Sequence, residues 1–121
     1  MLQGDFASAV KEVEKTSEYL SRVCEAVNNV NGVLIITSSY GGVEDFFNVG
    51  TGVLNKKRTK NLVPFLIIGR DYEGKSIGLE EAPNNDISLL ASQGSYLDIV
   101  PTILRVLDLE LPPDLEGESF V

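Results

Sequence analysis

Two short runs of apolar, mostly β-branched residues constrain the fold of this chain more than any other feature. The first run covers residues 33–37 (VLIIT), and the second covers residues 63–68 (VPFLII) and ends at Gly69. Neither run alternates apolar with polar residues, and uniform apolar runs of this length are typical of strands covered on both faces. A long helical pattern precedes the first run. We therefore predict an α/β domain with flanking helices and a mostly parallel or mixed sheet.

The first helix is predicted over residues 5–28, where apolar residues recur in steps of three, four and seven along one face. Asp5 is a suitable N-cap for this helix. The pattern ends at Asn28 and Asn29, and residues 31–32 (Asn-Gly) are typical of the turn that follows a helix.

The C-terminal part of the sequence predicts a second helix. Residues 95–107 (SYLDIVPTILRVL) have helical apolar spacing, with Pro101 in the first turns, where proline is tolerated. A short strand is predicted at residues 87–91. The proline-containing tail, residues 109–121, should be extended, with Phe120 and Val121 packed on the domain.

Composition excludes several classes of function. The chain has 121 residues, of which 43% are hydrophobic, and this suits one globular domain spanning residues 1–121. A net charge of -8 disfavours non-specific binding to nucleic acid or to anionic membranes. The single cysteine, Cys24, cannot form an internal disulfide, and no apolar stretch is long enough to cross a membrane. We therefore predict a cytoplasmic protein with no nucleic-acid or membrane partner.

Four blocks of sequence then carry a resemblance to a known family. They read GDFASAVKEVE from residue 4, GVLIITSSYGGVED from residue 32, RTKNLVPFLIIG from residue 58 and GSYLDIVPTILRVLDLELPPDLEGES from residue 94. Their order and spacing resemble the C-terminal part of cofactor-independent phosphoglycerate mutase, in the alkaline phosphatase superfamily. The resemblance covers nearly the whole chain and implies a partial alkaline-phosphatase-like three-layer domain.

The resemblance also implies where metal ligands should be. The family binds two divalent metals, usually manganese, and transfers a phosphoryl group through a serine in the N-terminal half of the phosphatase domain, a half that this sequence does not contain. The ligand positions that fall within this sequence are occupied by Leu2, Ser39, Tyr40 and Arg58. Leucine has no donor atom, a neutral hydroxyl is a poor ligand, and arginine brings a fixed positive charge. Because the chain also has no histidine, we predict no catalytic residue, no metal site and no cofactor.

Three functions follow from these observations. The first is a non-catalytic, metal-free derivative that acts as a structural or protein-interaction module. The family's sheet has further strands in the missing half, so a strand edge and an apolar face should need cover from a second copy or from another protein. The second is a working part of a phosphoglycerate mutase or related phosphatase, completed by a separate serine-bearing polypeptide.

The third function uses a basic cluster that opposes the overall acidity. Arg58, at a former ligand position, could hold an anion such as a phosphate ester, although a solvated loop is the simpler interpretation. The candidate anion-binding residues are Lys56, Lys57, Arg58 and Lys60. Nearby, Gly41–Gly42 could cradle a phosphate or simply form a tight turn. Glu44 and Asp45 could bind a cation together with water, but two adjacent carboxylates at the start of a helix are more often partners of the helix dipole, which is the interpretation we adopt.

Overall fold

The computed structural model describes residues 6–45, 48, 50–53, 55, 57–78 and 81–121. The chain divides into two compact units, Met1–Glu73 and Gly74–Val121, and each unit is described by itself. The prediction of a single domain over residues 1–121 stays a prediction. In the part of the chain that is described, no helix is long and apolar enough to cross a membrane, and a cytoplasmic location also stays a prediction.

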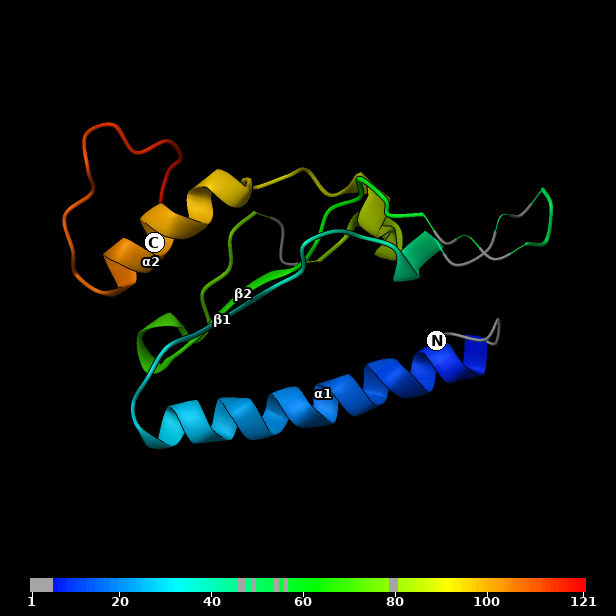
Figure 1. The fold of residues 1–121 in the computed structure, drawn as a ribbon, viewed down its shortest axis with the longest axis horizontal. Coiled ribbons are helices and arrows are strands. Elements are labelled where there is room, and N and C mark those ends of the chain that lie inside the picture. Colours follow the sequence, from blue (N-terminus) through cyan, green and yellow to red (C-terminus); the bar gives the residue numbers. More distant parts are fainter. Residues whose placement is uncertain (1–5, 46–47, 49, 54, 56, 79–80) are drawn as a thin grey trace. The chain divides into compact units, whose positions relative to one another are not determined.

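The first unit contains a long helix followed by a two-stranded sheet (Figure 1). Its elements are α1 (Phe6–Asn29), β1 (Leu34–Thr37), a 3₁₀ turn (Val43–Asp45), β2 (Phe65–Ile68) and a second 3₁₀ turn (Arg70–Tyr72). The predicted turn after α1 is confirmed, because Asn31 has a left-handed φ of 53° and the amide of Gly32 donates to the carbonyl of Val27 at 2.9 Å. The helix and both strands lie where they were predicted. Asp5, the predicted N-cap, lies outside the described residues.

The two strands pair antiparallel, with Leu34 opposite Ile68 and Thr37 opposite Phe65. The α/β class is confirmed. Of the two sheet arrangements predicted, parallel pairing does not hold for these strands, whereas an antiparallel pair can belong to a mixed sheet. Parallel neighbours need a crossover, usually a helix, that returns the chain to the same end of the sheet. In the described part of residues 38–64 the regular structure is a short 3₁₀ turn. The chain therefore reverses direction, and β2 begins beside the end of β1.

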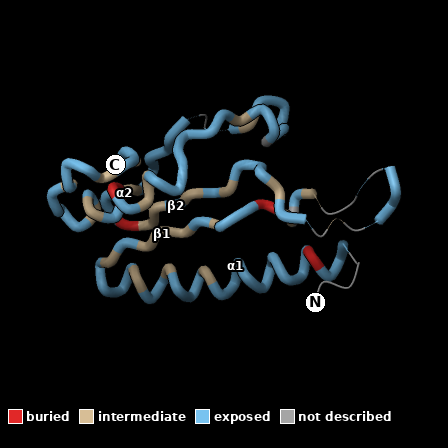
Figure 2. Tube along the Cα trace, turned by 45° about the horizontal axis from the view of Figure 1, so that its top comes forward, coloured by how far each residue is buried: buried red, intermediate tan, exposed pale blue. Residues whose placement is uncertain are grey.

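Most described residues of the first unit, apolar ones included, are exposed or half-buried (Figure 2). On α1, Ala9 is buried, whereas Phe6 is 65% exposed and Val13 is 54% exposed. In the sheet, Leu66 of β2 is 50% exposed, so the expectation that both strands are covered on both faces is wrong for this chain as described. A sheet of two strands with uniform apolar faces is marginal in water without further packing.

In the second unit, a 3₁₀ turn (Tyr96–Asp98) leads directly into α2 (Ile99–Val106), which confirms the predicted helix. Pro101 is buried in the first turn of α2. The strand predicted at residues 87–91 is wrong, because Ile87–Leu89 form a 3₁₀ turn. The carboxylate of Asp86 accepts hydrogen bonds from the amide and the hydroxyl of Ser88, at 2.9 and 2.6 Å, and this local bonding competes with an extended strand.

A buried threonine ties the C-terminal tail to α2. Thr102 is 0% exposed, and its hydroxyl donates to the carbonyl of Asp98 at 2.6 Å and accepts from the amide of Phe120 at 3.0 Å. The carboxylate of Asp98 accepts from the amides of Ser95 and Glu118 at 2.6 and 2.8 Å. The predicted packing of the tail is confirmed at Phe120, which is half-buried, whereas the final residue is exposed.

Replacing Thr102 with valine should destabilise the second unit by about 1–3 kcal/mol, because the part-buried amide of Phe120 would lose its acceptor. Urea unfolding followed by circular dichroism measures the loss. Thr102→Ser is the matched control, since it keeps the hydroxyl and removes one methyl group. Equal losses for the two variants would show that the hydroxyl does not hold the tail.

Candidate functional site

The loop after β1 is closely packed at a glycine. Gly41 is buried, and a Cβ atom at this position would collide with the side chains of Glu44 and Thr59. Just before it, the hydroxyl of Ser38 donates to the carbonyl of Tyr40 at 2.9 Å. Neither Gly41 nor Gly42 has a positive φ, so close packing, and not a left-handed backbone, accounts for the glycine at position 41.

The segment that leads into β2 lies beside this loop. Gly41 and Thr59 form an isolated antiparallel bridge, in which the amide of Thr59 donates to the carbonyl of Gly41 at 2.9 Å. Residues 40–44 and 58–61 are consequently brought together, although about fifteen residues separate them in the sequence.

One carboxylate connects the two segments further. Glu44 accepts from the hydroxyl of Thr59, from the side-chain amide of Asn61 at 3.2 Å, and from the backbone amide of Gly42 at 2.6 Å. These bonds, led by that from Thr59, lower the pKa of Glu44 from 4.5 to about 2. Glu44 is therefore ionised at neutral pH and holds both segments. The neighbouring Asp45 accepts from the side chain of Asn55 at 2.6 Å.

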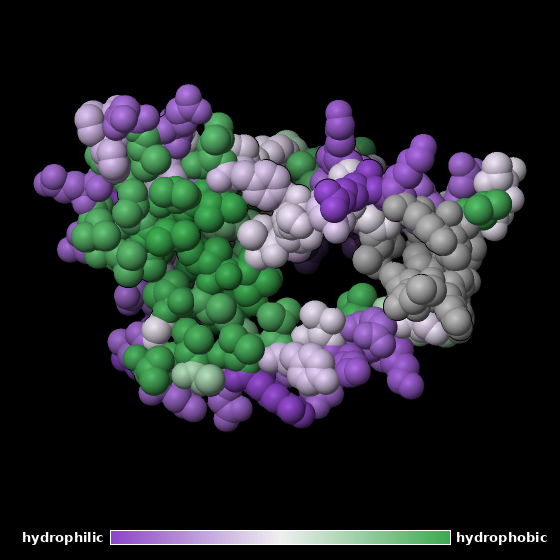
Figure 3. All heavy atoms as spheres, in the orientation of Figure 1, coloured by the Kyte–Doolittle hydropathy of each residue, from purple (hydrophilic) through white to green (hydrophobic). Residues whose placement is uncertain are grey.

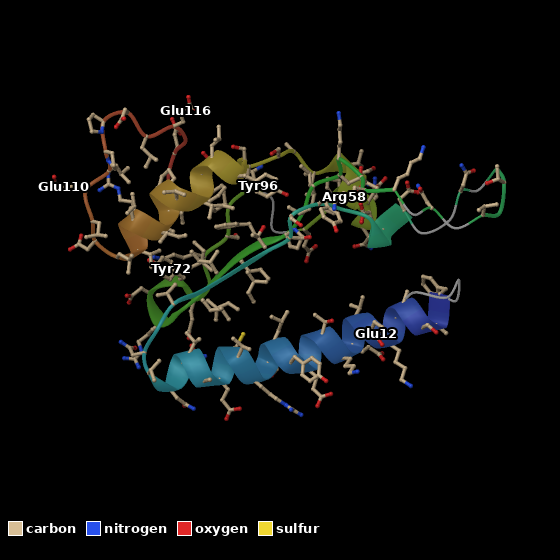
Figure 4. All side chains as sticks on the ribbon, in the orientation of Figure 1. Glu12, Arg58, Tyr72, Tyr96, Glu110 and Glu116 are labelled. Atoms are coloured by element: carbon tan, nitrogen blue, oxygen red, sulfur yellow. The ribbon has the colours of Figure 1, made fainter. Side chains whose placement is uncertain are left out.

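Tyr40 and Arg58, two of the positions where the resemblance implies metal ligands, are in contact with each other. The guanidinium of Arg58 lies over the ring of Tyr40, 4.1 Å from the ring centroid, within the range of a cation–π contact. Tyr40 is 46% exposed and Arg58 is exposed, so the pair lies at the surface, where Figure 4 shows Arg58 beside the loop that follows β1.

The other predicted site residues that the structure describes flank this pair in the sequence. Ser39 is exposed in the loop after β1, and Lys57 and Lys60 are exposed on either side of Arg58 and Thr59. Leu2 and Lys56 lie outside the described residues. Whether the basic residues bind an anion stays a prediction.

Sequence reasoning missed the hydrogen-bonding role of Glu44, which it interpreted as a partner of a helix N-terminus, and it did not single out Thr59 or Asn61. A signal was present, since Thr59 and Asn61 are two apart just before a predicted strand. In an extended segment such residues face the same side. Their shared partner could not be identified without the bridge at Gly41.

The donor atoms at this site do not fit a divalent metal. Among the described residues, no group of three or more histidine, cysteine, aspartate or glutamate side chains could hold a metal ion. Tyr40 offers a hydroxyl and an aromatic ring, and Arg58 offers hydrogen-bond donors with a permanent positive charge. The carboxylate of Glu44 is a single anionic group that already accepts three hydrogen bonds. A divalent ion needs anionic or imidazole ligands to balance its charge.

Comparison with known proteins agrees with the blocks in the sequence. The profile of the metalloenzyme superfamily matches residues 3–111. The chain belongs to the metalloenzyme superfamily. It is also similar to proteins named 2,3-bisphosphoglycerate-independent phosphoglycerate mutase, which confirms the resemblance to that family.

Three of these relatives show the extent of the similarity. Identity is 31% over 118 residues with the protein of Thermomicrobium roseum, covering 98% of this chain and 21% of the relative. It is 35% over 118 residues with that of Cellvibrio japonicus, covering 98% and 20%. With that of Clostridium perfringens strain SM101 it is 36% over 114 residues, covering 94% and 20%. The chain thus spans about a fifth of the length of the curated relatives it matches.

Glu44→Gln should remove a pH dependence of stability. Because the folded state lowers the pKa of Glu44, its carboxylate contributes stability above pH 4.5, and this contribution is lost as the pH falls from 4.5 towards 2. The difference in unfolding free energy between the wild type and the variant should therefore be largest near neutral pH and shrink below pH 4.5. Chemical denaturation at a series of pH values measures this difference.

Thr59→Val is the accompanying variant, since it removes the hydroxyl that contributes most to the lowered pKa. The carboxyl carbon of Glu44, followed by NMR, should then titrate closer to pH 4.5. An unchanged midpoint in this variant would contradict the role given to Thr59.

Proposed function

We propose that this chain is a non-catalytic, metal-free member of the metalloenzyme superfamily that acts as a structural or protein-interaction module. The observation that carries the proposal is the position of the Arg58 guanidinium on the ring of Tyr40. Both residues stand at positions where the resemblance implies metal ligands. A cation belonging to the protein is therefore present where the family would bind a cation from solution.

Electrostatics supports the loss of metal binding. The charge of arginine is permanent at any pH at which proteins fold. A divalent ion roughly 5 Å from the guanidinium would be repelled by about 2 kcal/mol even with the dielectric constant of water, and by more in a less polar environment. Ser39 and Tyr40 offer only hydroxyl groups, and the nearby carboxylate of Glu44 already accepts hydrogen bonds from Gly42, Thr59 and Asn61.

Exposed apolar surface supports the second part of the proposal, a protein partner. On the first unit, large apolar side chains that are exposed belong to α1, β2 and the loops; those on α1 are Phe6, Val10, Val13, Tyr19 and Val23. On the second unit, Figure 3 shows apolar surface over α2, where Val100 and Ile103 are exposed. Contiguous apolar surface of this kind marks interaction sites. We propose that a second copy of the chain or another protein covers it.

The two other functions fit less well. A phosphoglycerate mutase completed by a separate polypeptide would need a metal site, and Ser39, Tyr40 and Arg58 do not supply suitable donors. A phosphate ester bound at Arg58 would lie close to the ionised Glu44, which hydrogen-bonds the adjacent Thr59. Repulsion between the two anions disfavours that arrangement.

The metal-free part of the proposal predicts that the purified protein contains no stoichiometric manganese or zinc. Its melting temperature should be the same with EDTA and with added Mn²⁺, and it should not interconvert 2- and 3-phosphoglycerate under either condition. Elemental analysis, differential scanning calorimetry and a coupled enzyme assay test these points. One bound transition metal for each chain, or a melting temperature that rises with Mn²⁺, would overturn the proposal.

The interaction part predicts an assembly larger than the 13.2 kDa of one chain, measured by size-exclusion chromatography with light scattering in the presence of the partner or at increasing protein concentration. Val13→Lys should weaken that assembly, because it places a charge on exposed apolar surface of α1. Asn29→Lys is the matched control, since it adds the same charge to an exposed position about 160° around the helix from Val13.

Two results would count against a partner. One is a stable monomer at every concentration whose amides along both strands are well protected from hydrogen exchange. The other is an equal effect of the two lysine variants, which would indicate that net charge and not the apolar surface of α1 governs assembly.

A further inference from the structure

We infer that a group of five side chains forms a metal-independent lock between the loop after β1 and the segment before β2. The lock consists of Tyr40, Glu44, Arg58, Thr59 and Asn61. The inference rests on the proposed function, because it says what holds the two segments together where a metal ion does not. It extends that function by giving the substituted ligand positions a role of their own.

Backbone hydrogen bonding alone joins the two segments weakly. The described residues between the strands show a single isolated bridge, Gly41 with Thr59, in which the amide of Thr59 donates to the carbonyl of Gly41. An isolated bridge lacks the neighbouring pairs that make a strand ladder cooperative. Side chains must therefore supply much of the attachment between these segments.

The contact of Arg58 with Tyr40 supplies the first part of that attachment. The residues flank the bridge, one immediately before Gly41 and the other immediately before Thr59. Their separation of 4.1 Å places the cation close to the face of the ring. A planar guanidinium stacks on such a face in a way that the ammonium of lysine cannot.

Glu44 supplies the second part. Its carboxylate accepts one bond from Gly42 in its own loop and two from Thr59 and Asn61 in the opposite segment. Hydrogen bonds to an ionised acceptor are stronger than bonds between neutral groups. The carboxylate of Glu44 thus holds three hydrogen-bond donors around the bridge. A bound metal ion holds several anionic ligands in a comparable way, but there the central group is the cation.

A double-mutant cycle on the full chain tests the lock. The variants are Tyr40→Leu, Arg58→Gln and the two combined, and the readout is hydrogen exchange at the Thr59 amide, with the melting temperature measured in parallel. Each single change should speed exchange at Thr59 by about two- to fivefold. The double variant should exchange no faster than the more affected single variant, because either change alone abolishes the contact.

Three further variants separate the lock from a general loss of charge or packing. Lys57→Gln removes a positive charge next to Arg58, the residue whose guanidinium lies over the Tyr40 ring, and should leave exchange at Thr59 close to that of the wild type. Tyr40→Phe keeps the ring and should also resemble the wild type. Arg58→Lys keeps the charge without the planar stack and should give an intermediate result, which remains measurable if Tyr40→Leu does not fold.

The outcomes distinguish this inference from the proposed function. Additive effects in the cycle, or an equal effect of Lys57→Gln, would overturn the lock while leaving the metal-free proposal standing. A melting temperature of the wild type that rises with Mn²⁺ would overturn the proposed function, whatever the cycle shows. Non-additive effects together with no response to EDTA or Mn²⁺ would support both.

Discussion

The antiparallel pairing of β1 with β2 is the constraint on which the rest of the first unit depends. It sets Thr37 opposite Phe65, and therefore places the loop that leaves β1 beside the segment that enters β2. The bridge at Gly41 and Thr59 and the contacts of Glu44 follow from that placement. The paired strands are apolar, and their side chains are only partly buried. The polar contacts of the loops therefore lie next to exposed apolar surface.

The sequence predicts the elements better than their arrangement. Both helices, both strands and the turn at Asn31 could be predicted, because helical periodicity, apolar runs and an Asn-Gly pair are local signals. The direction of strand pairing is not local, and neither is the meeting of Tyr40 with Arg58. The error at residues 87–91 arose from a local competitor, since the Asp86 side chain bonds the backbone of Ser88 and favours a turn.

The candidate site shows the same division. The resemblance placed Ser39, Tyr40 and Arg58 at ligand positions, and the chemistry of those residue types was enough to doubt a metal. The contact that Tyr40 and Arg58 make with each other could not be inferred from either residue alone. Similarity to phosphoglycerate mutases over nearly the whole chain, at 30–36% identity, therefore reports a shared domain more directly than a shared reaction.

The hydrogen bonds that hold the tail have a consequence for how the second unit tolerates change. Asp98 and Thr102, one helical turn apart, receive the amides of Glu118 and Phe120, and a side chain at Gly117 would collide with the carbonyl of Leu97. The segment between α2 and these contacts is thus a closed loop with both ends fixed. Insertions in its middle, around the prolines, would lengthen the loop at small entropic cost, whereas a one-residue shift at Gly117 would misalign both amides together.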